Sequence, residues 1–184
     1  MKFKKFKFKK VKSTNDTAIR LIRKNNFTSG MVVSETQLKG KGQYGRKWIS
    51  HKGNLFVSFF YEFSLHNLSI STITKNNCLL VKKLLSKYVK KKIFYKKPND
   101  LLIDKKKISG ILQETISISD NKFLIVGIGI NLVKSPKIKN YPTTSIFELI
   151  DNQVNKISIE NELKVLFEKN LSRMYKINYK LNKI

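Results

Sequence analysis

The residues best suited to chemistry lie in one short loop that is rich in glycine and in positive charge. Residues 39–47 read KGKGQYGRK, with three glycines and four cationic side chains. Glycines let a backbone come close to a ligand, and exposed backbone N–H groups beside cations bind anions. Trp48, the single tryptophan of the chain, follows directly, and its ring is suited to stacking on a nucleobase. The loop therefore favours a site for an anionic nucleotide.

The spacing of the glycines differs from the common phosphate-binding motifs. A Walker loop needs G-x-x-x-x-G-K-[ST], which this loop lacks. Gly40, Gly42 and Gly45 fit the pattern G-x-G-x-x-G, but a strand rather than a helix is expected to follow them. From these residues alone, a solvated surface loop in a lysine-rich protein stays open as an alternative.

Strands and helices are expected to surround this loop. Alternating apolar residues predict strands, and apolar residues at helical spacing predict helices. Ser13 begins a helix N-cap pattern, and Ser145 with Glu148 forms a capping box. The helices are expected after Ser13, after Ser145 and over 74–91 and 158–175, and the strands over 3–11, 31–34, 54–63, 93–95, 101–103, 108–118 and 123–132. This order predicts a single α+β domain over residues 1–184.

The composition restricts the classes of protein to consider. The chain has 184 residues, 34 of them lysines, and its formal net charge is +26. Lysine, asparagine and isoleucine, which all have A/T-rich codons, make up 72 residues, so codon bias is the favoured source of the charge and polyanion binding is the alternative. The single cysteine, Cys78, excludes a disulfide framework and a multi-cysteine zinc site, and a buried thiol is expected there.

We expect a cytoplasmic protein that does not enter a membrane. No apolar run approaches the roughly 18 residues of a transmembrane helix. The N-terminal MKFKKFKFKK is basic but no apolar stretch follows it, so a secretory signal is not expected. His51 and His66 have no partners at metal-binding spacing and are expected at the surface. The lysines scatter along the whole chain, so specific binding of nucleic acid is not expected.

Five short blocks become informative when they are taken together in their order. They are Ser13 to Asn15, Gln37 to Trp48, Lys96 to Leu101, Lys107 to Leu112 and Gly127 to Asn131. In order and spacing they closely resemble the catalytic domain of biotin–protein ligases. A later segment of that family also fits Thr144, Ser145, Ile146 and Glu148. The resemblance therefore spans residues 13 to 148.

The resemblance implies a fold and a two-step reaction. The fold is α+β and like the core of class II aminoacyl-tRNA synthetases, with a mixed, mainly antiparallel sheet flanked by helices. Biotin and ATP, with Mg²⁺, give biotinyl-5′-AMP and pyrophosphate. A lysine of a biotin carboxyl carrier protein, from acetyl-CoA carboxylase or a related carboxylase, then takes the biotin and releases AMP. A monomer or a weak homodimer is expected.

The resemblance also implies roles for residues of the five blocks. The expected catalytic residues are Lys107, Asp100 and Arg46, with Lys107 bridging the biotin carboxylate and the α-phosphate. Asp100 is expected to orient Lys107 or the incoming amine, and a contact with Mg²⁺ stays open. The expected ATP-binding residues are Lys41, Arg46, Trp48, Asn99, Lys107 and Asn131. The expected biotin-binding residues are Ser13, Thr14, Asn15, Gln37, Gly40, Lys41, Gly42, Gln43, Lys107, Gly110, Gly127 and Gly129.

The chain departs from the family pattern in three respects. Gln43 stands where the family usually has an arginine that helps to retain the adenylate, so some leak of the intermediate is expected. Lys97 replaces a common tryptophan before Pro98. Neither an N-terminal helix-turn-helix nor a full C-terminal SH3-like domain is expected.

Three other functions stay open on the residues. They are a lipoate– or octanoate–protein ligase of the same superfamily, a non-catalytic basic nucleic-acid-binding module, and a degraded ligase that only binds biotin. The loop from Gly40 to Trp48 favours biotin over lipoate. The retained Lys107, Asp100 and Arg46 argue against a degraded site.

Overall fold

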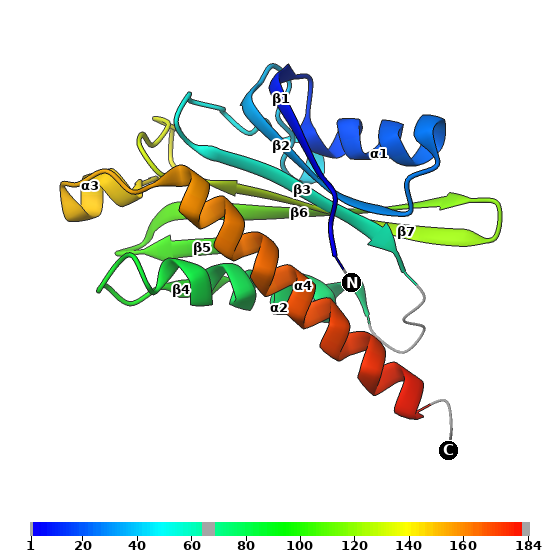
Figure 1. Ribbon diagram of the computed structural model, residues 1–184. Helices are drawn as coiled ribbons and strands as arrows, with labels where there is room; N and C mark the ends of the chain where they lie inside the picture. Colours follow the sequence, from blue (N-terminus) through cyan, green and yellow to red (C-terminus); the bar gives the residue numbers. More distant parts are fainter. Residues whose placement is uncertain (1, 64–68, 182–184) are drawn as a thin grey trace.

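The computed structural model describes residues 2–63 and 69–181, with side chains up to residue 173, so His66 lies outside the described part. Its strands form one sheet in the order β1-β2-β3-β7-β6-β5-β4 (Figure 1). The strands are β1 (Lys5–Val11), β2 (Ser29–Gln37), β3 (Leu55–Glu62), β4 (Phe94–Lys96), β5 (Asp100–Ile103), β6 (Lys106–Ile118) and β7 (Asn121–Ile130). The helices are α1 (Thr14–Asn25), α2 (Ile70–Leu85), α3 (Ile146–Ile150) and α4 (Lys156–Leu181), and Gln43–Gly45 forms a 3₁₀ turn.

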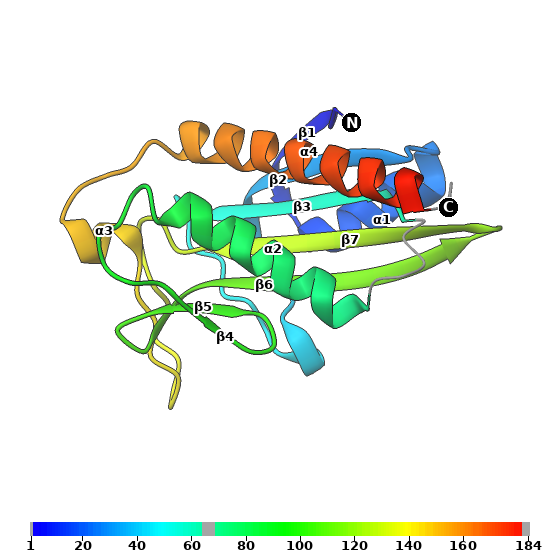
Figure 2. The ribbon, with the colours of Figure 1, turned by 90° about the horizontal axis from the view of Figure 1, so that it is seen from below.

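The sheet is mixed and mainly antiparallel. β1 runs parallel to β2, because α1 connects them as a crossover, and each other neighbouring pair is antiparallel. Helices α2 and α4 cover one face of the sheet and α1 covers the other, as Figure 2 shows from below. The predicted fold class, α+β with a mixed, mainly antiparallel sheet flanked by helices, is therefore confirmed.

The central strand β3 shows how the sequence fills both faces. Phe59 belongs to the large core under α2 and α4, whereas Phe60 belongs to the smaller core under α1. Successive residues of a strand point to opposite faces, so a nearly continuous apolar run suits a strand that is covered on both sides. Ser58 interrupts this run as a polar residue, yet it is fully buried and hydrogen-bonds to α1.

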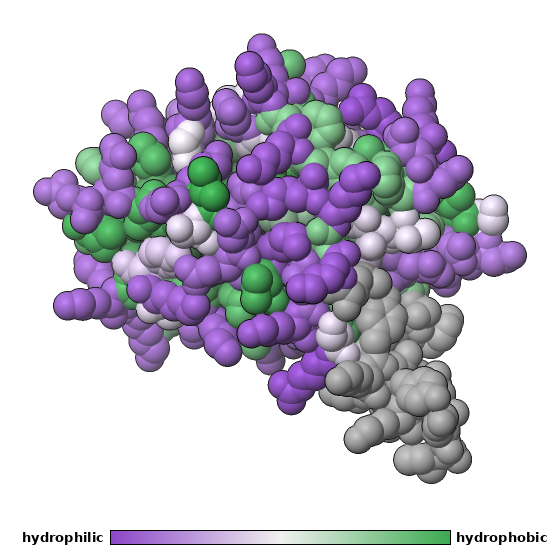
Figure 3. Space-filling model, viewed as in Figure 1, coloured by the Kyte–Doolittle hydropathy of each residue, from purple (hydrophilic) through white to green (hydrophobic). Residues whose placement is uncertain are grey.

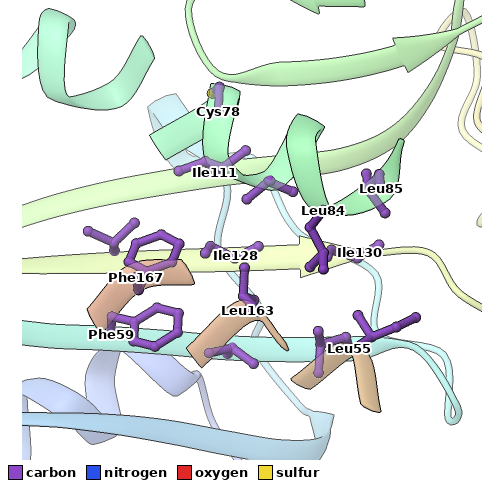
Figure 4. Packing of buried hydrophobic residues seen from close by; sticks show 14 of the residues in the cluster. Leu55, Phe59, Cys78, Leu84, Leu85, Ile111, Ile128, Ile130, Leu163 and Phe167 are labelled. Atoms are coloured by element: carbon purple, nitrogen blue, oxygen red, sulfur yellow. The ribbon is translucent and has the colours of Figure 1, made fainter. Parts of the chain in front are cut away.

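The large core joins α4 to the middle of the sheet. The rings of Phe59 and Phe167 stack with centroids 4.1 Å apart and planes within 5°. Figure 4 shows this pair beside Leu163 and Ile128. Burying one such side chain contributes roughly 1.5–3 kcal/mol, so α4 is held on the sheet mainly by apolar contact. Cys78 lies in the same core, as expected, and burial raises the pKa of its thiol to about 12.

The structure corrects the predicted ends of several elements. Helix α2 spans Ile70–Leu85 rather than 74–91, because the Ser69 side chain caps its first turn and the chain turns away after Ser86. Strand β2 spans Ser29–Gln37 rather than 31–34, since β1 and β3 pair with it on both sides. The predicted caps at Ser13 and Ser145 are confirmed, as each hydroxyl accepts from the backbone three residues later.

Strand β1 forms one edge of the sheet and carries a row of lysines. Lys7, Lys9 and Lys10 are exposed, whereas Lys5 reaches α4 and pairs with Glu160 at 2.7 Å. Charged side chains on an edge strand discourage pairing with further strands. The rest of the surface seen in Figure 3 is also largely hydrophilic. Although α4 is 26 residues long, no helix in the described residues is apolar enough to cross a membrane.

Candidate active site

The predicted site residues meet at one cavity. It has a volume of about 870 Å³ and lies between the start of α1, the loop 39–47, strands β5 to β7 and the loop before α3. Five blocks that are far apart in the sequence thus share one surface. The predicted residues that line the cavity are Ser13, Thr14, Asn15, Gln37, Lys41, Gly42, Gln43, Arg46, Trp48, Asn99, Asp100, Lys107, Gly110, Gly127, Gly129 and Asn131.

Gly40 alone among the predicted residues is absent from the cavity wall, and it serves the base of the loop instead. Its carbonyl accepts from Trp48 N at 2.9 Å, and a Cβ at this position would lie 2.5 Å from the Trp48 carbonyl oxygen. The two arms of the loop meet again where Gly42 N donates to the Arg46 carbonyl at 2.7 Å. Backbone hydrogen bonds therefore join the two arms of the loop, and Gly40 allows them to come this close. The loop is more ordered than the solvated surface loop that the sequence left open as an alternative.

The first turn of α1 points at the cavity and is tied to the end of β2. Gln37 Oε1 accepts from the backbone N of Thr14 at 2.8 Å and from its hydroxyl at 3.1 Å. Gln37 Nε2 donates to Ser50 Oγ at 3.2 Å. The amide of Gln37 is therefore oriented by its neighbours. A helix N-terminus also carries a partial positive charge, which suits a polar or anionic ligand.

Asn15 is held by a buried network that the sequence did not reveal. Its Oδ1 accepts from the Ser58 hydroxyl at 2.5 Å, and its Nδ2 donates to Glu114 Oε2 at 2.6 Å. A Cβ on Gly127 would overlap the Asn15 amide. The protein itself thus uses most of the hydrogen-bonding capacity of Asn15, which acts as a rigid part of the cavity wall.

Lys107 and Asp100 form an ion pair at the centre of the site. Lys107 Nζ lies 2.7 Å from Asp100 Oδ1, and the two side chains are only 18% and 13% exposed. The ammonium also lies 5.3 Å from the ring centroid of Trp48. Strand β5 carries the aspartate and β6 the lysine, and the pairing of these two strands brings them together.

The Trp48 ring packs against two glycines of the sheet. A Cβ on Gly110 would lie 2.8 Å from the Trp48 ring, and one on Gly129 would overlap it. Trp48 Nε1 is buried and has no hydrogen-bond partner among the described residues. A buried donor without a partner costs free energy, so this N–H group is available to a ligand or to a water molecule.

Asn99 and Asn131 fix the backbone at the cavity wall. Asn99 Nδ2 donates to the Ile111 carbonyl at 2.6 Å, and Asn131 Nδ2 donates to the Thr144 carbonyl at 3.0 Å. The turn after β7 is held further by Asn54, whose Oδ1 accepts from three successive backbone N–H groups at 2.9–3.2 Å. Asn99 and Asn131 thus line the cavity as predicted, and each side-chain amide donates a hydrogen bond to a backbone carbonyl of the protein.

The cavity is strongly positive. Its described lining holds seven cationic side chains and a single carboxylate, that of Asp100. Lys41 Nζ pairs with Asp16 in the first turn of α1 at 2.5 Å, and this contact raises the pKa of Lys41. Among the described residues, no group of three or more His, Cys, Asp or Glu side chains could hold a metal. The electrostatics therefore suit anionic ligands.

Sequence reasoning missed four residues at this site. The sequence did mark Ser58 as unusual, because it is a polar residue inside an otherwise apolar run of the Phe-rich strand β3. Glu114 and Asp16 carry charges in predicted elements, but only the fold shows that they reach Asn15 and Lys41. Tyr141 had no local signal, since its contact with Asp100 joins segments that are 41 residues apart.

Comparison of the sequence with known proteins identifies a family. The model of the Biotin/lipoate A/B protein ligase family matches residues 7–131. The bifunctional ligase/repressor BirA of Bacillus subtilis is 27% identical over 165 residues, which cover 85% of this chain and 50% of that protein. The chain therefore spans about half the length of this curated relative.

Solved structures with a similar fold agree with this result. A biotin protein ligase from Aquifex aeolicus, in complex with biotin and ATP, has a TM-score of 0.76 and 28% identity, covering 92% of this chain and 70% of that chain. A lipoate protein ligase from Thermoplasma acidophilum, with a TM-score of 0.62 and 12% identity over 94% of this chain and 84% of that chain, shares the fold alone. Since the family match covers more than half of its residues, the chain belongs to the biotin/lipoate A/B protein ligase family.

Proposed function

We propose that the chain activates biotin with ATP to biotinyl-5′-AMP and then transfers the biotin to a lysine of a carrier protein. The observation that carries this proposal is the Lys107–Asp100 pair beside Trp48, in a cavity whose other charged lining is cationic. The similar ligase from Aquifex aeolicus was solved with biotin and ATP, the two small substrates of the proposed reaction.

In the first step, a carboxylate oxygen of biotin attacks the α-phosphorus of ATP. The bond from the α-phosphorus to the bridging oxygen breaks, and pyrophosphate leaves. Both reactants are anions, so their repulsion must be offset by cations in a site with little water. Lys107 is suited to bridge the two anionic groups, and Arg46 and Lys41 share the charge. Hydrogen bonds to charged groups contribute about 1.5–3 kcal/mol each in such a setting.

In the second step, the amine of the carrier lysine attacks the carbonyl carbon of the mixed anhydride. An amide bond forms, the bond from the carbonyl carbon to the phosphate oxygen breaks, AMP leaves, and the amine loses a proton. We propose that Asp100 keeps Lys107 oriented through both steps. The loop 39–47 covers the adenylate and protects it from hydrolysis.

The remaining residues are proposed to bind the two small substrates. Ser13, Thr14 and Gln37 lie at the end of the cavity formed by α1 and bind polar groups of biotin. Gly110, Gly127 and Gly129 make room for the Trp48 ring and the Asn15 amide, which form the wall against which the flat rings of biotin pack. The nucleobase stacks against Trp48, in the neighbourhood of Asn99 and Asn131. Gly42 and Gln43 line the cavity and are proposed to contact biotin, as the family resemblance implies, whereas Gly40 supports the base of the loop.

Mg²⁺ is proposed to enter with ATP rather than to occupy a protein cage. Magnesium prefers oxygen ligands and is commonly held by substrate phosphates, one or two carboxylates and water. Asp100 is the one carboxylate in the described lining, and its two oxygens already contact Lys107 and Tyr141. The donor set therefore fits a metal that is held mainly by phosphates and water.

The carrier is proposed to be the biotin carboxyl carrier protein of acetyl-CoA carboxylase or a related carboxylase. The excess of positive charge suits an acidic carrier domain and raises the rate of encounter. We propose that the protein acts as a monomer or a weak homodimer in the cytoplasm and binds no specific nucleic acid.

A carrier-free reaction tests the proposal. The protein is mixed with biotin and MgATP, and biotinyl-AMP is sought by mass spectrometry. The Lys107→Gln variant should form the adenylate at least about 100-fold more slowly, since a charged contact to the reacting groups is lost. Lys106→Gln, which changes the neighbouring exposed lysine, should stay close to the wild-type rate. Pyrophosphate release with lipoate but not with biotin would replace this assignment by the lipoate ligase alternative.

A further inference from the structure

Tyr141 contacts both members of the central ion pair, although no motif marks it. It lies in the loop between β7 and α3 and lines the cavity. Its hydroxyl donates to Asp100 Oδ2 at 2.5 Å. Its ring centroid lies 5.5 Å from Lys107 Nζ. One side chain therefore reaches the lysine and the carboxylate that the proposed reaction uses.

The ammonium of Lys107 is held from three directions. Asp100 Oδ1 lies 2.7 Å from it, and the ring centroids of Trp48 and Tyr141 lie 5.3 Å and 5.5 Å away. An ammonium is attracted to the face of an aromatic ring, and the attraction grows as water is excluded. Because both charged side chains are mostly buried, these contacts restrict where the ammonium can lie.

Backbone hydrogen bonds fix the position from which Tyr141 approaches. Lys107 N donates to the Pro142 carbonyl at 2.8 Å, and Thr144 N donates to the Lys107 carbonyl at 2.9 Å. Tyr141 directly precedes this paired stretch. The backbone next to Tyr141 is therefore anchored to the same residue whose ammonium the Tyr141 side chain contacts.

The environment keeps the phenol protonated. Burial, followed by the hydrogen bond to Asp100, raises the pKa of Tyr141 above its usual value. A protonated phenol can donate to Asp100 throughout the range in which an enzyme works. Lys96 Nζ also lies 3.4 Å from the Tyr141 oxygen and 4.6 Å from its ring centroid, which adds a second cation on the outer side.

We propose that Tyr141 is a positioning residue for the Lys107–Asp100 pair, with its hydroxyl holding the carboxylate and its ring holding the ammonium. When the anionic substrates bind, the ammonium of Lys107 donates hydrogen bonds to them. Asp100 then stays in place through Tyr141. The catalytic part of this inference rests on the proposed function, whereas the placement of Lys107 can be measured without any turnover.

The placement is tested by amine labelling of the free protein. An amine-acylating reagent is added, and its rate of reaction at Lys107 is measured by peptide mass spectrometry relative to exposed Lys75. In Tyr141→Leu, which removes both the ring and the hydroxyl, labelling of Lys107 should rise about fivefold. Tyr141→Phe keeps the ring and should show a smaller rise.

The catalytic part is tested by the rate of biotinyl-AMP formation per active site, with active sites counted from the burst amplitude. Tyr141→Phe should be about tenfold slower, because one hydrogen bond to a charged group is lost. Tyr141→Leu should be slower again. Tyr88→Phe is the matched control, since Tyr88 also donates to a carboxylate, that of Glu162, but lies away from the cavity. It should keep the wild-type rate per active site.

The outcomes separate the inference from the proposed function. If Tyr141→Phe keeps the wild-type rate per active site, or if Tyr141→Leu leaves the labelling of Lys107 unchanged, the positioning role is wrong. If the wild-type protein makes no biotinyl-AMP at all, the proposed function fails, and the labelling rates alone then decide whether Tyr141 holds Lys107.

Discussion

Gly110, Gly127 and Gly129 act at the scale of single residues by leaving space for other side chains. The Trp48 ring fills the space above Gly110 and Gly129, and the Asn15 amide fills the space above Gly127. The two occupants differ in freedom. Asn15 is fixed by Ser58 and Glu114, whereas Trp48 has no hydrogen-bond partner for its Nε1 among the described residues. The same substitution should therefore have different effects at two neighbouring positions.

Gly129→Ala should displace the Trp48 ring and change the fluorescence of the single tryptophan. ATP binding should weaken by about tenfold, because the ring that is proposed to stack on the nucleobase has moved. Gly127→Ala, on the same strand, should leave the emission unchanged. It should lower the free energy of unfolding by about 1–3 kcal/mol, since the hydrogen bonds of Asn15 prevent its amide from moving away from the added methyl group. Emission spectra and denaturant unfolding of the two variants measure this contrast. Identical emission in the wild type and Gly129→Ala would contradict it.

The single residues of the site could be predicted only as far as motifs reach. Ser13, Gln37, Asp100 and Lys107 belong to blocks with a recognisable order, so the sequence was enough to bring them to one cavity. Tyr141 belongs to no block, and its contact with Asp100 depends on how a loop folds back over the sheet. Such contacts arise from tertiary structure and leave no local pattern.

At the scale of elements, the loop 39–47 is joined to α1 by the ion pair between Lys41 and Asp16. We predict that the backbone amides of this loop exchange hydrogen more slowly once biotin and MgATP are present, since the bound adenylate orders the loop. Asp16→Asn should speed the exchange in the ligand-free protein by several-fold. Hydrogen exchange followed by mass spectrometry measures both effects.

A matched substitution serves as the control for the loop. Asp104 forms a similar exposed pair with Lys91 at 2.7 Å, outside the cavity lining. Asp104→Asn should leave the exchange of residues 39–47 unchanged. Equal exchange of the loop with and without the ligands would show that it does not close over the site.

The turn that follows α2 is joined to α4 by a pH-dependent contact. Glu162 accepts from Lys87 Nζ at 2.6 Å and from the Tyr88 hydroxyl at 2.5 Å. These two hydrogen bonds hold the pKa of Glu162 below its ordinary value of 4.5, and the bond from Lys87 has the larger effect. A carboxylate with a lowered folded-state pKa adds stability above its unfolded pKa, and this stability is lost as the pH falls through the folded value.

Glu162→Gln should therefore be less stable than the wild type at pH 7, and the difference should shrink at low pH. The unfolding free energy of both proteins is measured in denaturant from about pH 7 to about pH 3, across the range in which a glutamate titrates. A difference that stays constant over this range would mean that the charge of Glu162 contributes nothing.

The ends of elements were harder to predict than their existence. The periodic apolar residues indicated α2, but the cap at Ser69 and the turn after Ser86 set its limits. β2 looked like a short strand because only part of it is apolar, whereas its full length follows from pairing with β1 and β3. Boundaries depend on partners that the local sequence does not contain.

At the scale of the whole molecule, the net charge of +26 should govern encounters with a large acidic partner. We predict that biotin transfer to an acidic carrier domain slows several-fold as ionic strength rises from about 0.05 to about 0.3 M, because salt screens the attraction. Formation of biotinyl-AMP from the small substrates, measured in parallel, should change much less. If both rates respond equally to salt, the charge plays no part in recognition of the carrier.

The lysine row of β1 has a consequence for how this protein behaves at high concentration. Neighbouring strands of a sheet lie about 4.8 Å apart, which is less than the screening length of about 8 Å at physiological salt. If two molecules paired through this edge, the ammonium groups of Lys7, Lys9 and Lys10 in one molecule would lie close to those of the other. Salt at physiological concentration would not remove the repulsion between them. The exposed lysines of β1 therefore oppose the growth of a continuous sheet from one molecule to the next.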